Sequence, residues 1–220
     1  MVQTVVYDTD TSDMLIPHGL FRTFFSTADS VVGSASDAGA EKVRDAHSYL
    51  DNVLRFLDAH HGGEDAILWP LLTARCSGEA ELIGRMEGEH ESIHRRRDEA
   101  DAALEVWYAT PNGETARRLS SALADLGAEI DRHFAEEEAE VLPLASRYVS
   151  PEEWGALPGH AMAHFNGDKL WLILGLIFEQ LPPEVVTTLL TSVLPPPVVD
   201  MWEGSGKAAF ADFIGRVRTA

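Results

Sequence analysis

The chain has 220 residues, 45% of them hydrophobic and 24% charged, which is typical of a globular protein that buries a core without disulfides. Its formal net charge of −19 argues against nucleic acid or an anionic membrane as a partner, because both need a basic face. The single Cys76, the lack of a secretory signal pattern and a longest apolar run of about nine residues predict a cytoplasmic protein without a membrane span.

The sequence predicts helices almost throughout, so the expected fold class is all-α. Four long helices are expected at about 16–32, 40–75, 79–108 and 114–148, separated by stretches rich in turn-forming residues. Pro70 is expected to kink the second helix or to end its regular part. Four long helices with short connections predict an up-and-down four-helix bundle over residues 1–149.

Residues 150–220 are predicted to form a C-terminal helical extension. Ser150 is a suitable N-cap, and it is followed by a proline and two acids that favour a first helical turn. Helices are expected near 151–181, 184–193 and 205–218, divided by two runs of proline. We expect the extension either to pack on the bundle or to mediate association, giving a monomer or a homodimer.

One pattern of residues occurs twice in the predicted bundle. It consists of a histidine, a glutamate four residues later and a proline six residues after that, as His60, Glu64 and Pro70 and again as His133, Glu137 and Pro143. His18 lies 42 residues before the first copy, and His90 lies 43 residues before the second. Residues four apart share one helix face, so each pair offers two ligands to a metal. Two such hairpins would bring imidazoles and carboxylates to one central point.

The two halves differ in the third predicted helix. His94 lies four residues after His90, whereas Arg22 lies four residues after His18. The candidate metal ligands are therefore His18, His60, Glu64, His90, His94, His133 and Glu137. With both carboxylates bridging, three histidines could hold one metal and two the other, which leaves an open position on the second. Imidazole and carboxylate ligands suit iron, manganese or zinc.

These seven positions, in this order across four helices, resemble the haemerythrin-like, or HHE cation-binding, family over about residues 13–148. The resemblance implies a bundle around two iron ions, an oxo- and carboxylate-bridged non-haem di-iron centre that binds dioxygen end-on at the open iron. By position it implies one iron on His90, His94 and His133, the other on His18 and His60, and bridges from Glu64 and Glu137. The fourth helix departs from the oxygen carriers, whose longer motif ends in Asp, and is closer to bacterial and iron-sensing members.

Other residues near the motifs leave alternatives open. His61 lies about 100° around the helix from His60, so it is predicted to be interfacial or solvated, with ligation in place of its neighbour as the alternative. His47 is predicted to lie on the surface. His160 and His164 are expected to form a packing pair, although they could cap the site or form a second metal site. The two glycines at 62 and 63 indicate either local loosening or close approach of another helix.

The function predicted from these residues is binding of dioxygen, nitric oxide or peroxide at a di-iron site, for sensing, storage or detoxification. The first alternative is an enzyme, a catalase-like or NO- or peroxide-reducing oxidoreductase, with Tyr49, Tyr108, Tyr148 and His61 as candidate proton donors. The second is a helical interaction module without metal. A ferritin-like oxidase would need Glu-x-x-His on two helices, and a zinc hydrolase would leave the repeated hairpin unexplained.

Overall fold

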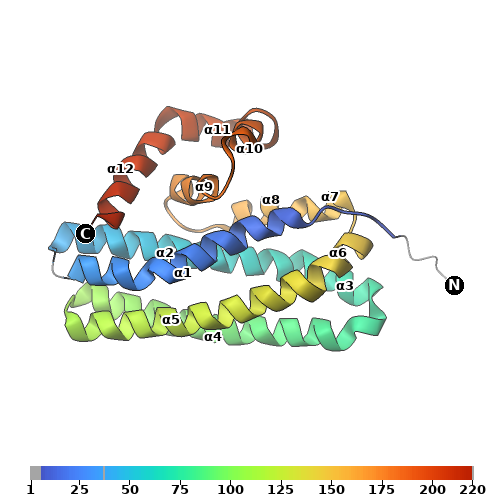
Figure 1. Cartoon of the computed structure of the whole chain (residues 1–220), viewed down its shortest axis with the longest axis horizontal. Coiled ribbons are helices and arrows are strands. Elements are labelled where there is room, and N and C mark those ends of the chain that lie inside the picture. The colour runs from blue at the N-terminus through green and yellow to red at the C-terminus, as the bar shows by residue number, and fades with distance from the viewer. Residues whose placement is uncertain (1–5, 37, 220) are drawn as a thin grey trace.

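A computed structural model describes residues 6–36 and 38–219, which are mostly helical and contain no strand. Four long helices form a bundle (Figure 1). They are α1 (Leu15–Ser36), α2 (Ala40–Gly63) continued by α3 (Trp69–Arg75), α4 (Ala80–Ala109), and α5 (Gly113–Glu136) continued by α6 (Leu142–Tyr148). Helices α1 and α2 form one hairpin, and α4 and α5 form the other. The two hairpins pack through two pairs of helices, α1 with α5 and α2 with α4. The predicted all-α bundle is confirmed.

Short caps and turns delimit these helices. Asn112 caps α5, because its side chain accepts hydrogen bonds from the backbone N–H groups of Glu114 and Thr115. Gly39 precedes α2 at a φ of 100°, a left-handed conformation that favours glycine. Single 3-10 turns at Ser12–Met14 and Ser77–Glu79 precede α1 and α4. The chain therefore reverses direction within a few residues at each connection.

The C-terminal extension contains six shorter helices. They are α7 (Pro151–Trp154), α8 (Ala156–His164), α9 (Leu170–Phe178), α10 (Pro183–Thr188), α11 (Pro196–Met201) and α12 (Lys207–Arg218). The predicted single helix at 151–181 is wrong, because the chain leaves the helix between α8 and α9. There the side chain of Asn52, on α2, accepts a hydrogen bond from the backbone of Lys169 and donates one to Asp168. This anchored turn redirects the chain across the bundle.

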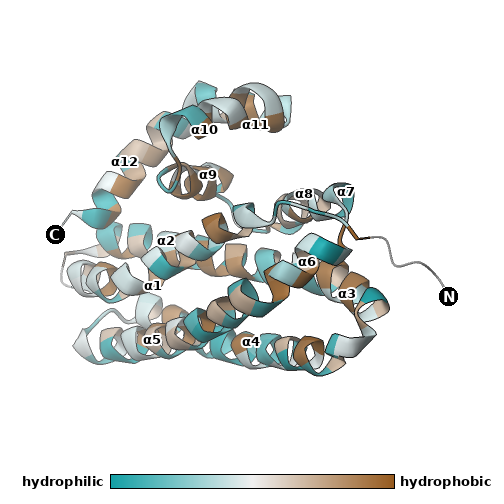
Figure 2. Cartoon of the chain, turned by 45° about the vertical axis from the view of Figure 1, so that its right-hand side comes forward, coloured by the Kyte–Doolittle hydropathy of each residue, from teal (hydrophilic) through white to brown (hydrophobic). Residues whose placement is uncertain are grey.

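Helices α9 and α12 lie against one side of the bundle, over α1 and α2 (Figure 1). Figure 2 shows that α9 is hydrophobic along most of its length. Its buried Leu172 and Leu176 belong to the same apolar cluster as the bundle interior. The extension thus shares a core with the bundle, and its role in dimerisation stays a prediction. No described helix combines the length and the apolar character that crossing a membrane requires.

Two separate apolar clusters fill the interior. The larger spans most of the bundle together with α9 and α12, and it includes Phe21, Leu57 and Phe134. The smaller lies around α3, α6 and α7, and it includes Leu68 and Val141. Along the chain from α2 to α3 the larger cluster ends at Leu57 and the smaller begins at Leu68. A layer of polar residues lies between the two clusters.

Candidate metal centre

A layer of polar residues separates the two apolar clusters. Nine polar or charged residues are buried in the described part of the chain, and seven of them belong to this layer. The seven are His18, His60, His61, Glu64, His90, His133 and Glu137. Burying a charge or an unpaired polar group costs free energy unless a partner or a metal compensates it. The layer therefore requires an explanation beyond packing.

The repeated proline explains the local backbone of both motifs. Proline has no N–H, and its ring clashes with the carbonyl four residues earlier in an α-helix. The chain avoids this with one π-helical turn at Glu64–Leu68 and another at Glu137–Val141. In each turn the residue before the proline donates its N–H to the carbonyl of the glutamate. The helix thus continues past Pro70 rather than ending there, and wide turns of this kind are frequent at functional sites.

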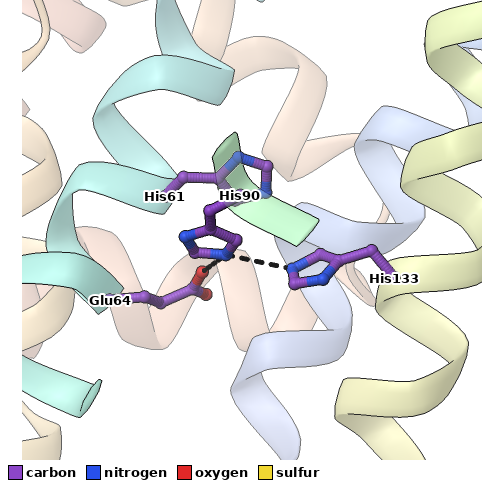
Figure 3. A group of neighbouring side chains, drawn as sticks. All are labelled: His61, Glu64, His90 and His133. Carbon is purple, nitrogen blue, oxygen red and sulfur yellow. Dashed lines mark hydrogen bonds and ion pairs between the residues drawn. The ribbon is translucent and has the colours of Figure 1, made fainter. Parts of the chain in front are cut away.

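One half of the layer gathers His61, Glu64, His90 and His133, whose ligand atoms all lie within 4.8 Å of one another (Figure 3). The Nε2 atoms of His90 and His133 are 3.1 Å apart. The Nε2 of His90 is 3.4 Å from Oε2 of Glu64. Two nitrogens that each lie roughly 2.1 Å from a metal, at a right angle, are about 3 Å apart. This spacing fits joint coordination of one ion.

The other half gathers His18, His60 and Glu64 within the same limit. Glu64 is shared, since Oε1 lies 3.4 Å from His60 while Oε2 lies near His90. Glu137 also lies between the halves, with Oε2 3.3 Å from Nε2 of His18 and 4.0 Å from Nε2 of His133. Both carboxylates therefore lie between the two groups of histidines.

Most of these ligand atoms make no hydrogen bond of good geometry. Nine buried side-chain nitrogen or oxygen atoms in the described residues lack such a bond, and seven belong to the layer. They are Nε2 of His18, His60 and His61 and both carboxylate oxygens of Glu64 and Glu137. An unsatisfied buried polar atom costs about 1–3 kcal/mol. Metal ions would satisfy these atoms together, so the residues present fit a metal centre.

The ionisation of the layer reflects its burial. Burial and the nearby charge of Glu137 raise the pKa of Glu64 to about 7. Burial and neighbouring imidazoles lower the pKa of His60 and His61 well below the usual range, which keeps both neutral. Burial opposes charge on His90, but contacts with Asp65 and Glu64 outweigh it and raise its pKa to about 10. Since a ligand must lose its proton to bind, metal binding here would release protons.

Six of the seven predicted ligands lie in the layer, and His94 does not join them. Its side chain is 46% exposed, and its Nε2 lies 3.9 Å from Asp65. His61 lies in the layer instead, 1% exposed, with its ring stacked on His90 at 4.4 Å. A solvated position for His61 is therefore wrong, and its ring lies buried at the interface of α2 with α4.

Aligning the two motifs indicates an inward position for His61, which the helix angle alone does not indicate. The counterpart of His61 is Phe134, since each follows the first histidine of its motif. Phe134 stacks on His18 at a centroid distance of 3.7 Å, as His61 stacks on His90. Each motif thus sends a second aromatic ring inward, and only one of the two rings carries nitrogen. The two halves of the layer differ at this pair.

A model of the Hemerythrin HHE cation binding domain matches residues 10–145, more than half of the chain. The chain belongs to the haemerythrin HHE family. No curated protein and no solved structure matched the chain in the searches. A buried group of histidine and glutamate inside a cation-binding domain supports a metal site in this haemerythrin domain.

The remaining histidines of the chain lie outside the haemerythrin site. His47, predicted to lie on the surface, is half-buried, with 19% of its side chain exposed and its Nε2 2.8 Å from Oε1 of Glu105. His160 and His164 form the expected packing pair, with rings stacked at 3.9 Å. Neither belongs to a group of described residues that could hold a metal.

The position of α8 decides between local loosening and close helix approach at the two glycines, Gly62 and Gly63. A Cβ atom on Gly63 would lie 3.6 Å from Nδ1 of His160 and 3.8 Å from Leu157, both on α8. A Cβ atom on Gly62 would meet nothing within 4 Å. Close helix approach therefore applies at Gly63 only, where α8 covers the turn that carries His60 and Glu64.

Proposed function

We propose that this haemerythrin domain holds two iron ions and binds dioxygen, or a related small ligand such as nitric oxide or peroxide, for sensing, storage or detoxification. In this proposal one iron is held by His61, His90 and His133, the other by His18 and His60, and Glu64 and Glu137 bridge them. The observation that carries the proposal is the convergence of buried, unpartnered ligand atoms into two groups that share Glu64. His61 takes the place that the sequence assigns to His94.

The ligand set supports iron over softer metals. Five imidazoles and two carboxylates offer only nitrogen and oxygen, which suits iron, manganese or zinc, and the single thiol of the chain, Cys76, belongs to the smaller apolar cluster. A bound iron pair would supply the electrons needed for reversible capture of a diatomic ligand.

The two-histidine half supports a binding position for a small apolar molecule. Phe134 stacks on His18, and the ring of Phe21 lies 5.5 Å from that of His60. Phe56 packs on Phe21 at 5.4 Å, which extends the aromatic wall. This half has two histidines against three in the other, so it is the half with fewer protein ligands. A dry wall excludes water and favours a neutral ligand.

The surroundings favour binding over turnover of peroxide. Of the candidate proton donors, His61 lies in the layer but is expected to be a ligand. Tyr49 is buried against Phe24, and Tyr108 stacks on the half-buried His47. Tyr148 packs against the smaller apolar cluster, so none of the three tyrosines is among the seven residues of the layer. A catalase-like or NO-reducing enzyme would need a proton source that these positions do not supply.

The test is an optical titration of protein loaded with iron under anaerobic conditions. We expect two irons per chain by metal analysis and an absorption change on admitting oxygen that reverses when oxygen is removed. Peroxide added to the same sample should disappear slowly. Glu137→Ala should lose iron and the oxygen response, whereas Glu140→Ala, an exposed acid three residues on, should keep both.

Two results would contradict the proposal. Protein that keeps less than one iron per chain after loading would favour a helical module without metal. Rapid catalytic loss of peroxide or nitric oxide, with no reversible oxygen response, would favour the oxidoreductase instead.

A further inference from the structure

We propose that Asp65 and Glu138 are positioning residues that each hold the outer nitrogen of a metal-binding histidine on the opposite hairpin. This inference rests on the proposed function. Each of these acids directly follows a bridging glutamate, Asp65 after Glu64 and Glu138 after Glu137. The sequence pattern is thus longer than the ligand motif, because it adds a second acid to each copy.

The contacts are short and equivalent in the two halves. Oδ1 of Asp65, which follows the end of α2, lies 2.6 Å from Nδ1 of His90 on α4. Oε1 of Glu138, which follows the end of α5, lies 2.8 Å from Nδ1 of His18 on α1. In both, Nδ1 donates to the carboxylate, so Nε2 is left as the atom that faces the layer. We call each such contact a clasp.

Both clasps cross between hairpins. The first hairpin is α1 with α2, and the second is α4 with α5, so Asp65 reaches from the first to the second and Glu138 reaches back. Glu64 and Glu137 contact histidines of both halves from inside. The two acids of each motif therefore contact one histidine of the other hairpin. The glutamate lies at its Nε2, which faces the layer, and the acid that follows lies at its Nδ1.

A basic side chain four residues after each clasped histidine lies beside the acid. Arg22 lies four residues after His18, and its Nη1 is 2.7 Å from Oε1 of Glu138. His94 lies four residues after His90, and its Nε2 is 3.9 Å from Oδ2 of Asp65. Arg22 and His94 thus have the same place in the two halves, which accounts for the position of His94 outside the layer.

One further contact belongs to a single half. Oε2 of Glu89, the residue before His90, lies 3.0 Å from Nδ1 of His133. Pro17 stands at the corresponding position before His18, and it has no carboxylate. The half that holds His90 and His133 therefore has two carboxylates at Nδ1 atoms, those of Asp65 and Glu89. The half that holds His18 and His60 has one, that of Glu138.

The clasps have a chemical consequence at the metal. A carboxylate that accepts the outer N–H of an imidazole fixes its tautomer and orientation and increases its basicity as a ligand. Removing such a partner costs about 10- to 100-fold in metal affinity. A more basic imidazole also stabilises the oxidised metal, so losing the clasp raises the reduction potential.

The experiment uses Asp65→Asn and Glu138→Gln, which remove the charge and keep the shape. The control is Glu140→Gln, which removes the same charge from an exposed position in the second π turn. For each protein we would measure the rate at which iron passes to an external chelator, the reduction potential of the iron-loaded form and the affinity for Co²⁺. We expect each clasp variant to bind about 10- to 100-fold more weakly and to have a higher potential, with the control like the wild type.

The outcomes separate the clasp from the proposed function. If the wild type holds two irons and both clasp variants match the control in affinity and potential, the clasp is refuted and the function stands. If the wild type holds no iron but binds Co²⁺, and the variants bind Co²⁺ more weakly, the function fails and the clasp stands. If the wild type binds neither metal, both fail.

A swap tests the equivalence of His94 and Arg22. His94→Arg gives the second half the same cation as the first, so it should keep both irons and an unchanged potential. If His94 is instead a ligand, the variant loses an iron, and the equivalence is refuted.

Discussion

His61 offers the sharpest test of the site, because one substitution separates its nitrogen from its ring. Phe134 has the corresponding place in the other motif and stacks on His18 as His61 stacks on His90. His61→Phe therefore keeps an aromatic ring at this position, as at Phe134, and removes the ring nitrogens. His61→Leu, which removes the ring as well, guards against a misfit of the larger phenyl group.

The expected effect has opposite signs with and without metal. Nε2 of His61 is buried and has no hydrogen-bond partner, so replacing it should stabilise the metal-free protein by about 1–3 kcal/mol. For a chain of this size that is roughly 2–4 °C of melting temperature per kcal/mol. With metal at a thousand times its dissociation constant, binding adds about 4 kcal/mol to the free energy of unfolding. If the variant binds a hundredfold more weakly, this added stability falls by about 2.7 kcal/mol.

The assay is thermal unfolding followed by circular dichroism, on protein stripped with a chelator and on protein loaded with iron. His61→Phe should melt higher than the wild type when stripped, and its gain on loading should be smaller by about 3 kcal/mol. The control is His94→Gln, at a half-exposed position, which should change either form by less than about 0.5 kcal/mol. Equal gains on loading in the His61→Phe variant and the wild type, together with a lost gain in His94→Gln, would refute the reasoning and restore His94 as a ligand.

Three further predictions concern the metal, the fold and pH. Chelation should lower the melting temperature of the wild type by several degrees and leave Glu137→Ala nearly unchanged, because the variant lacks a bridging ligand; calorimetry with and without chelator checks this. Gly175→Ala should destabilise by about 1–3 kcal/mol, since a Cβ atom there would lie 2.2 Å from the ring of Phe210 on α12, whereas Gly84→Ala, with open space, should stabilise; denaturant titration compares them. Glu153 pairs with Arg75, whose hydrogen bonds lower the pKa of Glu153 to about 2, so this contribution is full above pH 4.5, at about 1 kcal/mol or less, and is lost as pH falls toward 2. The difference in melting temperature between wild type and Glu153→Gln should therefore narrow between pH 4.5 and 3, while exposed Glu152→Gln shows no such trend.

The prolines show how far local sequence rules reach. A proline inside a helical pattern predicts a kink or an end, and Pro70 and Pro143 do disturb the hydrogen-bond ladder. The structure resolves the disturbance as one wide turn that starts at each glutamate, so the helices continue into α3 and α6. Packing of Leu68 and Val141 in the smaller apolar cluster favours continuation over a break. That packing is a tertiary contact, and no local pattern contains it.

His94 and the C-terminal section show where local rules fail. Helical spacing puts His94 on the same face as His90, and only the position of Asp65 on the neighbouring helix gives its ring a partner outside the layer. In residues 151–181, by contrast, Asn166 and Gly167 are a local turn signal at the break between α8 and α9. The side chain of Asn52, more than a hundred residues earlier, then anchors that turn at Lys169. The position of His94 and the anchoring of this turn both depend on contacts between distant parts of the chain.

The sequence by itself determined the four long helices, the repeated motif and the chemistry of the layer, because helical periodicity and ligand type are local properties. Only the tertiary structure decided which histidines share that layer, since a difference of about 100° around a helix is too fine a distinction for spacing alone. The difference between the halves lies at His61 and Phe134, where one inward ring carries nitrogen and the other does not. Which ring nitrogens converge is fixed by how four helices pack, and that packing depends on the whole interior at once.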